Sequence, residues 1–168
     1  MKKLLIAVIM AICFAACKKI PELPAETQSG ANTFGCLVNG ELVIPYYYRD
    51  GKPYAVYDQI ADSLQITGYG QNHQAFIFTI KSPKINRPVS IDKIEYYPPK
   101  SYQNYFYGGY NTGEVMLTRF DSMVVSGVFN FVGYQHTYSF APEEEQIDMN
   151  SFVTVSMGRF DIALDIHK

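Results

Sequence analysis

From residue 33 onward, the chain consists of short runs in which apolar and polar residues alternate, separated by residues that favour turns. The clearest run lies near the C-terminus, where Phe160, Ile162, Leu164 and Ile166 alternate with charged or small residues. A period of two predicts strands with one buried and one solvated face. Strands are predicted at residues 34–38, 41–44, 46–49, 54–58, 63–68, 74–81, 89–97, 102–107, 114–120, 123–131, 134–140, 152–156 and 159–166.

This pattern predicts an all-β protein with a single domain at residues 33–168, because no window of helical length shows a period of 3.6 residues. About ten antiparallel strands, spaced by about 10 residues, are typical of a β-sandwich or of a closed barrel. Periodicity does not choose between the two. Asn39-Gly40 predicts a type I′ hairpin turn, which requires a positive φ at both positions. A polar loop is expected at residues 141–150.

The first 17 residues have the layout of a bacterial lipoprotein signal. Lys2 and Lys3 precede an apolar stretch, residues 4–16, that at 13 residues is too short to span a membrane. Small residues come directly before Cys17, which resembles the lipobox where lipoproteins are acylated and cleaved. We expect a signal peptide at residues 1–16 and a lipid, such as palmitate, on Cys17. A secretory signal with a chance cysteine is the alternative.

Residues 17–32 are expected to be the lipidated cysteine and a flexible tether, since the segment is polar, holds two prolines and shows no period. A lipid on Cys17 would attach the protein to a membrane of the cell envelope without spanning it. We expect the outer membrane. Lys18-Lys19, directly after the cysteine, favour its periplasmic side over the cell surface.

Charge and cysteine content narrow the possible functions. The full chain has a net charge of -2, and loss of Lys2 and Lys3 with the signal makes it more acidic. Nucleic-acid binding, which needs a basic surplus, is therefore not expected. Once Cys13 is removed and Cys17 is lipidated, Cys36 is left without a disulfide partner. Its apolar neighbours predict a buried, structural thiol.

The sequence shows no motif typical of an enzyme or of a cofactor site, so we expect neither catalysis nor a cofactor. The three histidines, His73, His136 and His167, have no zinc-site spacing. Asp161 and Asp165 are expected on the solvated face of the last strand, about 13 Å apart, which exceeds the separation of glycosidase carboxylates.

A loop rich in acidic residues also invites comparison with metal sites. Glu143–Glu145, Asp148 and Asn150 offer oxygen ligands of the kind that calcium takes, but their spacing matches no EF-hand. Charge runs of this kind are usually solvated loops, so no metal site is predicted.

Tyrosine is the unusual part of the composition: the chain has 14 tyrosines and no tryptophan. Most of the tyrosines fall in two clusters, at residues 46–57 and 96–110. A tyrosine offers a flat apolar ring and a hydroxyl, which suit stacking on a sugar or contact with a protein. Tyrosine is also common on half-buried strands, where it only packs. The candidate ligand-binding residues flank a glycine pair: Tyr102, Tyr105, Tyr107 and Tyr110.

Two parts of the sequence resemble a family of uncharacterised Bacteroidota lipoproteins that is known only as a domain of unknown function. The opening part is ETQSGANTFGCLVNG at residues 26–40. The closing part comprises LTRFD at 117–121, SGVFNF at 126–131 and GRFDI at 158–162. The resemblance implies a β-rich exported lipoprotein and brings no known activity or site residues.

Two functions follow from these observations. The first is a lipid-anchored, non-enzymatic β domain that binds a glycan or a protein partner through a tyrosine-rich face. The alternative is a structural or accessory envelope lipoprotein without a small-molecule ligand.

Overall fold

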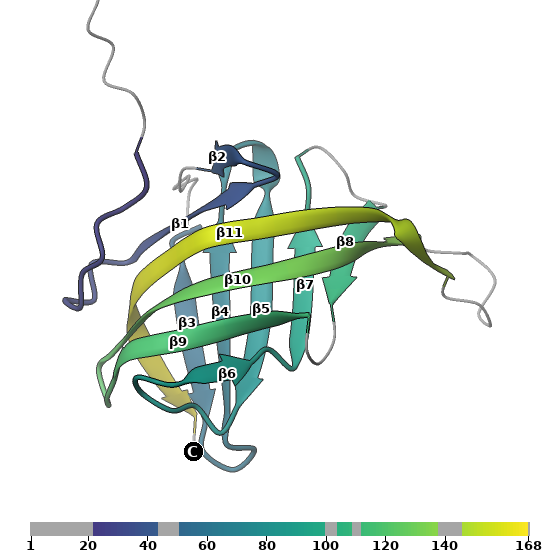
Figure 1. Ribbon diagram of the computed structural model, residues 1–168. Coiled ribbons are helices and arrows are strands. Elements are labelled where there is room, and N and C mark those ends of the chain that lie inside the picture. Colours follow the sequence, from purple (N-terminus) through teal and green to yellow (C-terminus); the bar gives the residue numbers. More distant parts are fainter. Residues whose placement is uncertain (1–21, 44–50, 100–103, 109–111, 138–145, 168) are drawn as a thin grey trace, which may run out of the picture.

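The computed structural model describes residues 22–43, 51–99, 104–108, 112–137 and 146–167 (Figure 1). The protein is all-β, and these residues contain eleven strands and one short 3₁₀ turn, η1, at Gln71–His73. In these residues, no helix combines the length and the apolar character of a membrane span. The strands are β1 (Thr33–Val38), β2 (Glu41–Val43), β3 (Tyr54–Asp58), β4 (Ser63–Tyr69), β5 (Ala75–Lys81), β6 (Pro88–Ser90), β7 (Lys93–Tyr97), β8 (Asn104–Gly108), β9 (Gly113–Phe120), β10 (Val124–Thr137) and β11 (Gln146–His167).

The strands form one mixed sheet that curls into a barrel-like ring, which confirms the predicted all-β class. Neighbouring strands pair in the order β3-β4-β5-β7-β8-β10-β11, and the end of β11 pairs in parallel with β3. All other pairs among the described strands are antiparallel. In Figure 1, β9, β10 and β11 cross in front of β3, β4 and β5, so the sheet encloses one core between two layers.

β10 and β11 are longer than the sequence pattern predicts. The strands predicted at 123–131 and 134–140 merge into β10, and β11 unites the two strands predicted at 152–156 and 159–166. β11 also contains residues 146–150 of the expected polar loop. Two register shifts in the β10–β11 ladder accommodate extra residues of β11. Because each shift interrupts the alternation, one long strand looks like several short ones in the sequence.

Phenylalanine rings from four strands form the centre of the core. The ring centroid of Phe129 on β10 lies 5.3 Å from that of Phe34 on β1 and 4.9 Å from that of Phe78 on β5. The ring centroid of Phe160 on β11 lies 6.2 Å from that of Phe129. Aromatic pairs at such separations contribute about 0.5–1.5 kcal/mol each beyond their burial. Phe129 therefore joins the two layers.

The predicted hairpin at Asn39-Gly40 connects β1 and β2. The φ angles are 49° at Asn39 and 83° at Gly40, both positive as a type I′ turn requires. The Asn39 amide donates a 2.8 Å hydrogen bond to the carbonyl of Thr154, and the Asn39 side chain accepts one of 2.9 Å from the Thr154 amide. These bonds fix the turn to β11.

The segment before β1 differs from the flexible tether expected at residues 17–32. From Pro24 onward, it is bonded to the outside of the sheet. Arg159 on β11 donates a 3.1 Å hydrogen bond to the carbonyl of Pro24, and its Nε lies 3.3 Å from a carboxylate oxygen of Glu26. The segment docks through polar groups rather than an apolar stripe, so its sequence carries no period that would reveal the docking.

Candidate functional site

Strands β7, β8 and β10 place aromatic side chains on the outside of the sheet. Tyr96 is buried in the core, so the next residue, Tyr97, points outward. Phe106 packs against the core, so its neighbours on β8, Tyr105 and Tyr107, point outward. There they lie opposite His136 and Tyr134 of β10. We call this outer surface the tyrosine face; it consists of Tyr97, Tyr105, Tyr107, Tyr134 and His136.

Tyr105 lies at the centre of the tyrosine face. Its ring stacks on Tyr97, with a centroid separation of 5.6 Å and 22° between the ring planes. Its hydroxyl lies 3.1 Å from Nδ1 of His136. Tyr107 contacts the same histidine, with 5.9 Å between the ring centroids. His136 is only 4% exposed, whereas the tyrosines are half-buried, so the tyrosines cover the histidine and form the outer layer.

Charged groups on β7 border the stacked rings. Glu95 accepts a 3.0 Å hydrogen bond from the hydroxyl of Tyr97, and its other carboxylate oxygen lies 2.5 Å from Nζ of Lys93. The bond to Glu95 raises the pKa of Lys93 above its ordinary value. Binding sites combine apolar surface with a few placed polar groups, and Glu95 supplies such a group beside the rings.

Exposed apolar side chains on β11 continue the tyrosine face. Ile147 pairs with His136 and is 49% exposed, and Phe152 pairs with Tyr134 and is 56% exposed. Met149 lies between them in sequence and is 63% exposed. Large apolar side chains gathered in one place on a surface are typical of interaction sites.

Of the four tyrosines that the sequence singled out, the structure brings two together. Tyr105 and Tyr107 share one face of β8. Tyr102, Tyr110 and the predicted lipidation residue Cys17 lie outside the described residues.

Sequence reasoning missed three members of the tyrosine face. Tyr97, Tyr134 and His136 join it because β7, β8 and β10 are neighbours in the sheet. Alternation within a strand indicates which residues share a face, but it does not indicate the neighbouring strand. The pairings of β8 with β7 and with β10 were therefore the missing information.

The first tyrosine cluster lies elsewhere in the sheet, on β3. Tyr54 contacts Tyr69 of β4, with 6.5 Å between ring centroids. The hydroxyl of Tyr57 donates a 2.7 Å hydrogen bond to Asp62, which raises the pKa of Tyr57 and lowers that of Asp62. The remaining members, residues 46–48, lie outside the described residues.

A second polar cluster surrounds Asp161, which is 1% exposed. Burial alone would raise its pKa, but hydrogen bonds outweigh burial and hold the pKa of this carboxyl well below its usual range. The expected solvated position is therefore wrong: Asp161 does point outward from the sheet, but the N-terminal segment covers it. The donors are Thr27 Oγ1 at 2.6 Å, Ser126 Oγ at 2.7 Å, the Gly30 amide at 2.8 Å and the Ser29 amide at 2.9 Å.

Cys36 is fully buried in the core, which confirms its predicted structural role. Burial raises the pKa of its thiol to about 12, so the thiol stays protonated and is a poor nucleophile. Among the residues that the structure describes, no three His, Cys, Asp or Glu side chains are grouped to hold a metal ion. Glu143–Glu145 lie outside that part of the chain.

No protein-family model, curated protein or solved structure matches this chain. Since a fold alone does not determine a function, the tyrosine face is the feature from which function has to be inferred.

Proposed function

We propose that this protein is a lipid-anchored, non-enzymatic protein of the bacterial cell envelope that binds a glycan through the tyrosine face. The stacked pair Tyr97–Tyr105, half-buried on the outside of the sheet, carries the proposal. A sugar ring can stack on such aromatic rings while its hydroxyl groups bond to phenols and to Glu95. Strand pairing and the contact with His136 already order Tyr105, so binding costs little side-chain entropy.

The membrane anchor is proposed on Cys17. Because the N-terminal segment is docked on the sheet, the chain that links the lipid to the domain would be short. Among the described residues, which begin at 22, Pro24 is the first whose backbone is bonded to the sheet, and six residues lie between it and Cys17 in the sequence. A fully extended chain of that length reaches about 20 Å. The domain, and with it the tyrosine face, would thus stay near the membrane surface.

Replacing Cys17 tests the anchor. The Cys17→Ala variant should lose incorporation of labelled fatty acid and should leave the membrane fraction. A Cys36→Ala variant is the matched control and should keep both properties, because Cys36 is buried in the domain. Fatty-acid labelling that survives in Cys17→Ala would contradict a lipid on this residue.

Glycan binding is tested on an array of bacterial and host glycans, followed by calorimetry with the glycan that binds best. Tyr97→Ala removes one ring of the stacked pair and should weaken binding about tenfold or more. Tyr54→Ala is the matched control: Tyr54 is 43% exposed and lies on β3, so the affinity should not change. Thermal unfolding verifies that both variants fold. Equal weakening by the two substitutions would contradict a site at the tyrosine face.

Three further outcomes separate the alternatives. A Tyr105→Ala, Tyr107→Ala double variant that folds and fails to bind supports the proposal. An unfolded double variant shows that these rings only pack over His136. An array without any specific binding favours a structural or accessory role.

A protein partner is the second candidate, and the exposed Ile147, Met149 and Phe152 favour it. A photo-reactive amino acid at position 152 should then cross-link to one envelope protein in intact cells. The same amino acid at Tyr54 is the control and should give no such product. A cross-link found equally at both positions would contradict a specific partner on this face.

A further inference from the structure

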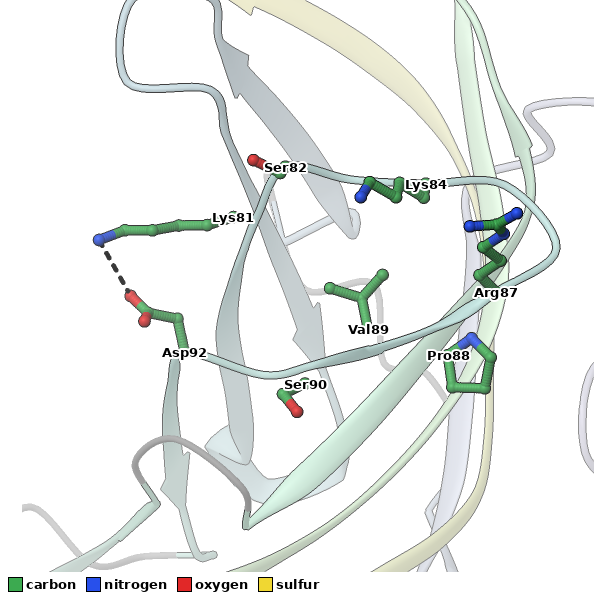
Figure 2. Close-up of a pocket in the computed structure, with 8 residues that line it drawn as sticks. All are labelled: Lys81, Ser82, Lys84, Arg87, Pro88, Val89, Ser90 and Asp92. Atoms are coloured by element: carbon green, nitrogen blue, oxygen red, sulfur yellow. Dashed lines mark ion pairs between the residues drawn. The ribbon is translucent and has the colours of Figure 1, made fainter.

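The loop between β5 and β7 encloses a pocket of about 380 Å³ that is separate from the tyrosine face. Figure 2 shows how the loop curls around it: Lys81 and Asp92 stand at the two ends of the loop, and Lys84 and Arg87 stand on its far turn. The volume lies within the range of small-molecule sites. Six of the eight lining residues are polar or charged, which indicates the kind of ligand that the pocket suits.

Positive charge exceeds negative charge in this pocket, although the chain as a whole is acidic with a net charge of -2. Asp92 is the one carboxylate in the lining, and it lies 3.7 Å from Nζ of Lys81. Within the described part of the chain, Lys84 and Arg87 have no ion-pair partner. The charge of Lys84 helps to lower the pKa of Asp62, but neither cation is held in an ion pair, so both are available to a ligand at the far turn of the loop.

A further carboxylate, Asp62, borders the loop, but its oxygens are already bonded. Oδ1 accepts a 2.7 Å hydrogen bond from the hydroxyl of Tyr57, and Oδ2 accepts one of 2.8 Å from Ser82 Oγ. Asp62 thus acts as a support for Ser82 in the pocket wall.

The loop backbone is fixed to neighbouring strands on both sides of the pocket. The Ser82 amide donates to the carbonyl of Asp62, and the Asn86 amide donates to the carbonyl of Leu117, each at 2.8 Å. Further along, the Ile91 amide donates to the carbonyl of Gly113 at 2.9 Å. The backbone that carries Lys84 and Arg87 is therefore ordered before a ligand arrives, which reduces the entropy lost on binding.

We propose that this pocket binds a phosphate or sulfate group between Lys84 and Arg87. A tetrahedral oxyanion has enough acceptor oxygens to bond both cations at once, and the planar guanidinium of Arg87 can donate two parallel hydrogen bonds to it. The group can be the free ion or a substituent of a sugar. Binding here does not depend on the tyrosine face, since Asp92 directly precedes β7 and Tyr97 ends it, about 16 Å away along the strand.

The test is an NMR titration of the full-length protein, solubilised in a zwitterionic detergent, with inorganic phosphate and with inorganic sulfate. Amide signals of residues 82–91 should shift and saturate. Lys84→Gln and Arg87→Gln should each weaken binding about tenfold, and the double variant should show no saturable shift. Lys52→Gln is the matched control, because it removes one positive charge from an exposed site outside the pocket.

Glucose 6-phosphate and glucose 6-sulfate, compared with glucose, distinguish the source of the group. Tighter binding of either ester than of the free ion assigns a sugar-borne group, and equal binding assigns the ion itself. Shifts that do not saturate, or that are equally large in the folded double variant, would overturn the proposal. Loss of binding in Lys52→Gln would overturn it as well, because a net-charge effect would then explain the result.

Discussion

Asp161 and Ser126 face each other across the β10–β11 ladder, and Ser126 Oγ donates a 2.7 Å hydrogen bond to Oδ1 of Asp161. Ser126 is fully buried. The two carboxylate oxygens of Asp161 also accept hydrogen bonds from residues 27–31 of the N-terminal segment. One carboxylate thus joins the N-terminal segment to the two longest strands, and its hydrogen-bond donors in the described part of the chain are hydroxyl groups and backbone amides.

Replacing this carboxylate with an amide should destabilise the protein. Asp161→Asn leaves some donors without an acceptor and places an NH₂ group against others, so the free energy of unfolding should fall by about 2–3 kcal/mol. Urea unfolding measures the change. Asp165→Asn is the matched control: it lies on the same strand, its side chain is 75% exposed, and its effect should stay within about 0.5 kcal/mol. Similar losses in both variants would contradict a special role for Asp161.

The lowered pKa of Asp161 predicts how stability depends on pH. The unfolded carboxyl titrates near 3.8, and the folded one titrates lower, so in acid the unfolded state binds a proton that the folded state does not. The stabilisation is therefore present above the unfolded pKa and is lost as the pH falls toward the folded pKa. Between about pH 6 and pH 3, wild type should lose more stability than Asp161→Asn does. Parallel curves for the two proteins would show that Asp161 does not contribute.

Release of the N-terminal segment can be followed separately from global unfolding. Glu26 lies in this segment and is exposed, so a glutamate-specific protease can cleave there once the segment detaches. Cleavage after Glu26 should be slow in wild type and in Asp165→Asn, and faster in Asp161→Asn at a urea concentration where all three remain folded. Equal rates would place the effect of Asp161 on the sheet rather than on the segment.

The sequence pattern predicted the regular ladders of the sheet well. The bounds of β3 match the prediction, and those of β4 and β5 differ by about one residue, because the β3–β4 and β4–β5 ladders run without register shifts. The bounds of β9 also differ by about one residue, although its ladder with β10 contains one register shift. β10 and β11 were divided wrongly, because bulges break the alternation. The strand predicted at 89–97 is also divided: β6 pairs with β9, and β7 pairs with β5.

Only part of the candidate site could be predicted from the sequence, for a related reason. The sequence singled out Tyr105 and Tyr107 as neighbours of a glycine pair, and the structure places both on one face of β8. His136 reaches the same face through a strand that is far away in the sequence, and local pattern does not encode that pairing. Asp161 was misjudged in the same way, because the segment that covers it is held by hydrogen bonds to a single carboxylate.

The buried thiol of Cys36 should be unreactive in the folded protein. It is fully buried, and burial raises its pKa to about 12, so very little thiolate exists at neutral pH. In a Cys13→Ser, Cys17→Ser variant, where Cys36 is the sole thiol, a maleimide reagent should label the native protein far more slowly than the urea-unfolded protein. Rapid labelling of the native protein would contradict a closed core around β1.

Phe129 and Phe152 provide a matched pair for separating core from surface. Phe129 is 3% exposed and contacts the rings of Phe34 and Phe78, so Phe129→Ala removes contacts between the two layers and leaves a cavity. We expect a loss of about 3–5 kcal/mol in the free energy of unfolding. Phe152→Ala truncates a ring that is 56% exposed, so its loss should be below about 1 kcal/mol.

Only one of these two substitutions should impair ligand binding. Phe152 extends the tyrosine face, so Phe152→Ala should reduce binding at that face with little loss of stability. If enough Phe129→Ala protein stays folded at low temperature, it should bind normally, because its lost contacts lie inside the sheet. Urea unfolding and calorimetry on the same samples measure both properties. A large loss of stability in Phe152→Ala would show that this ring packs within the fold instead of extending a binding surface.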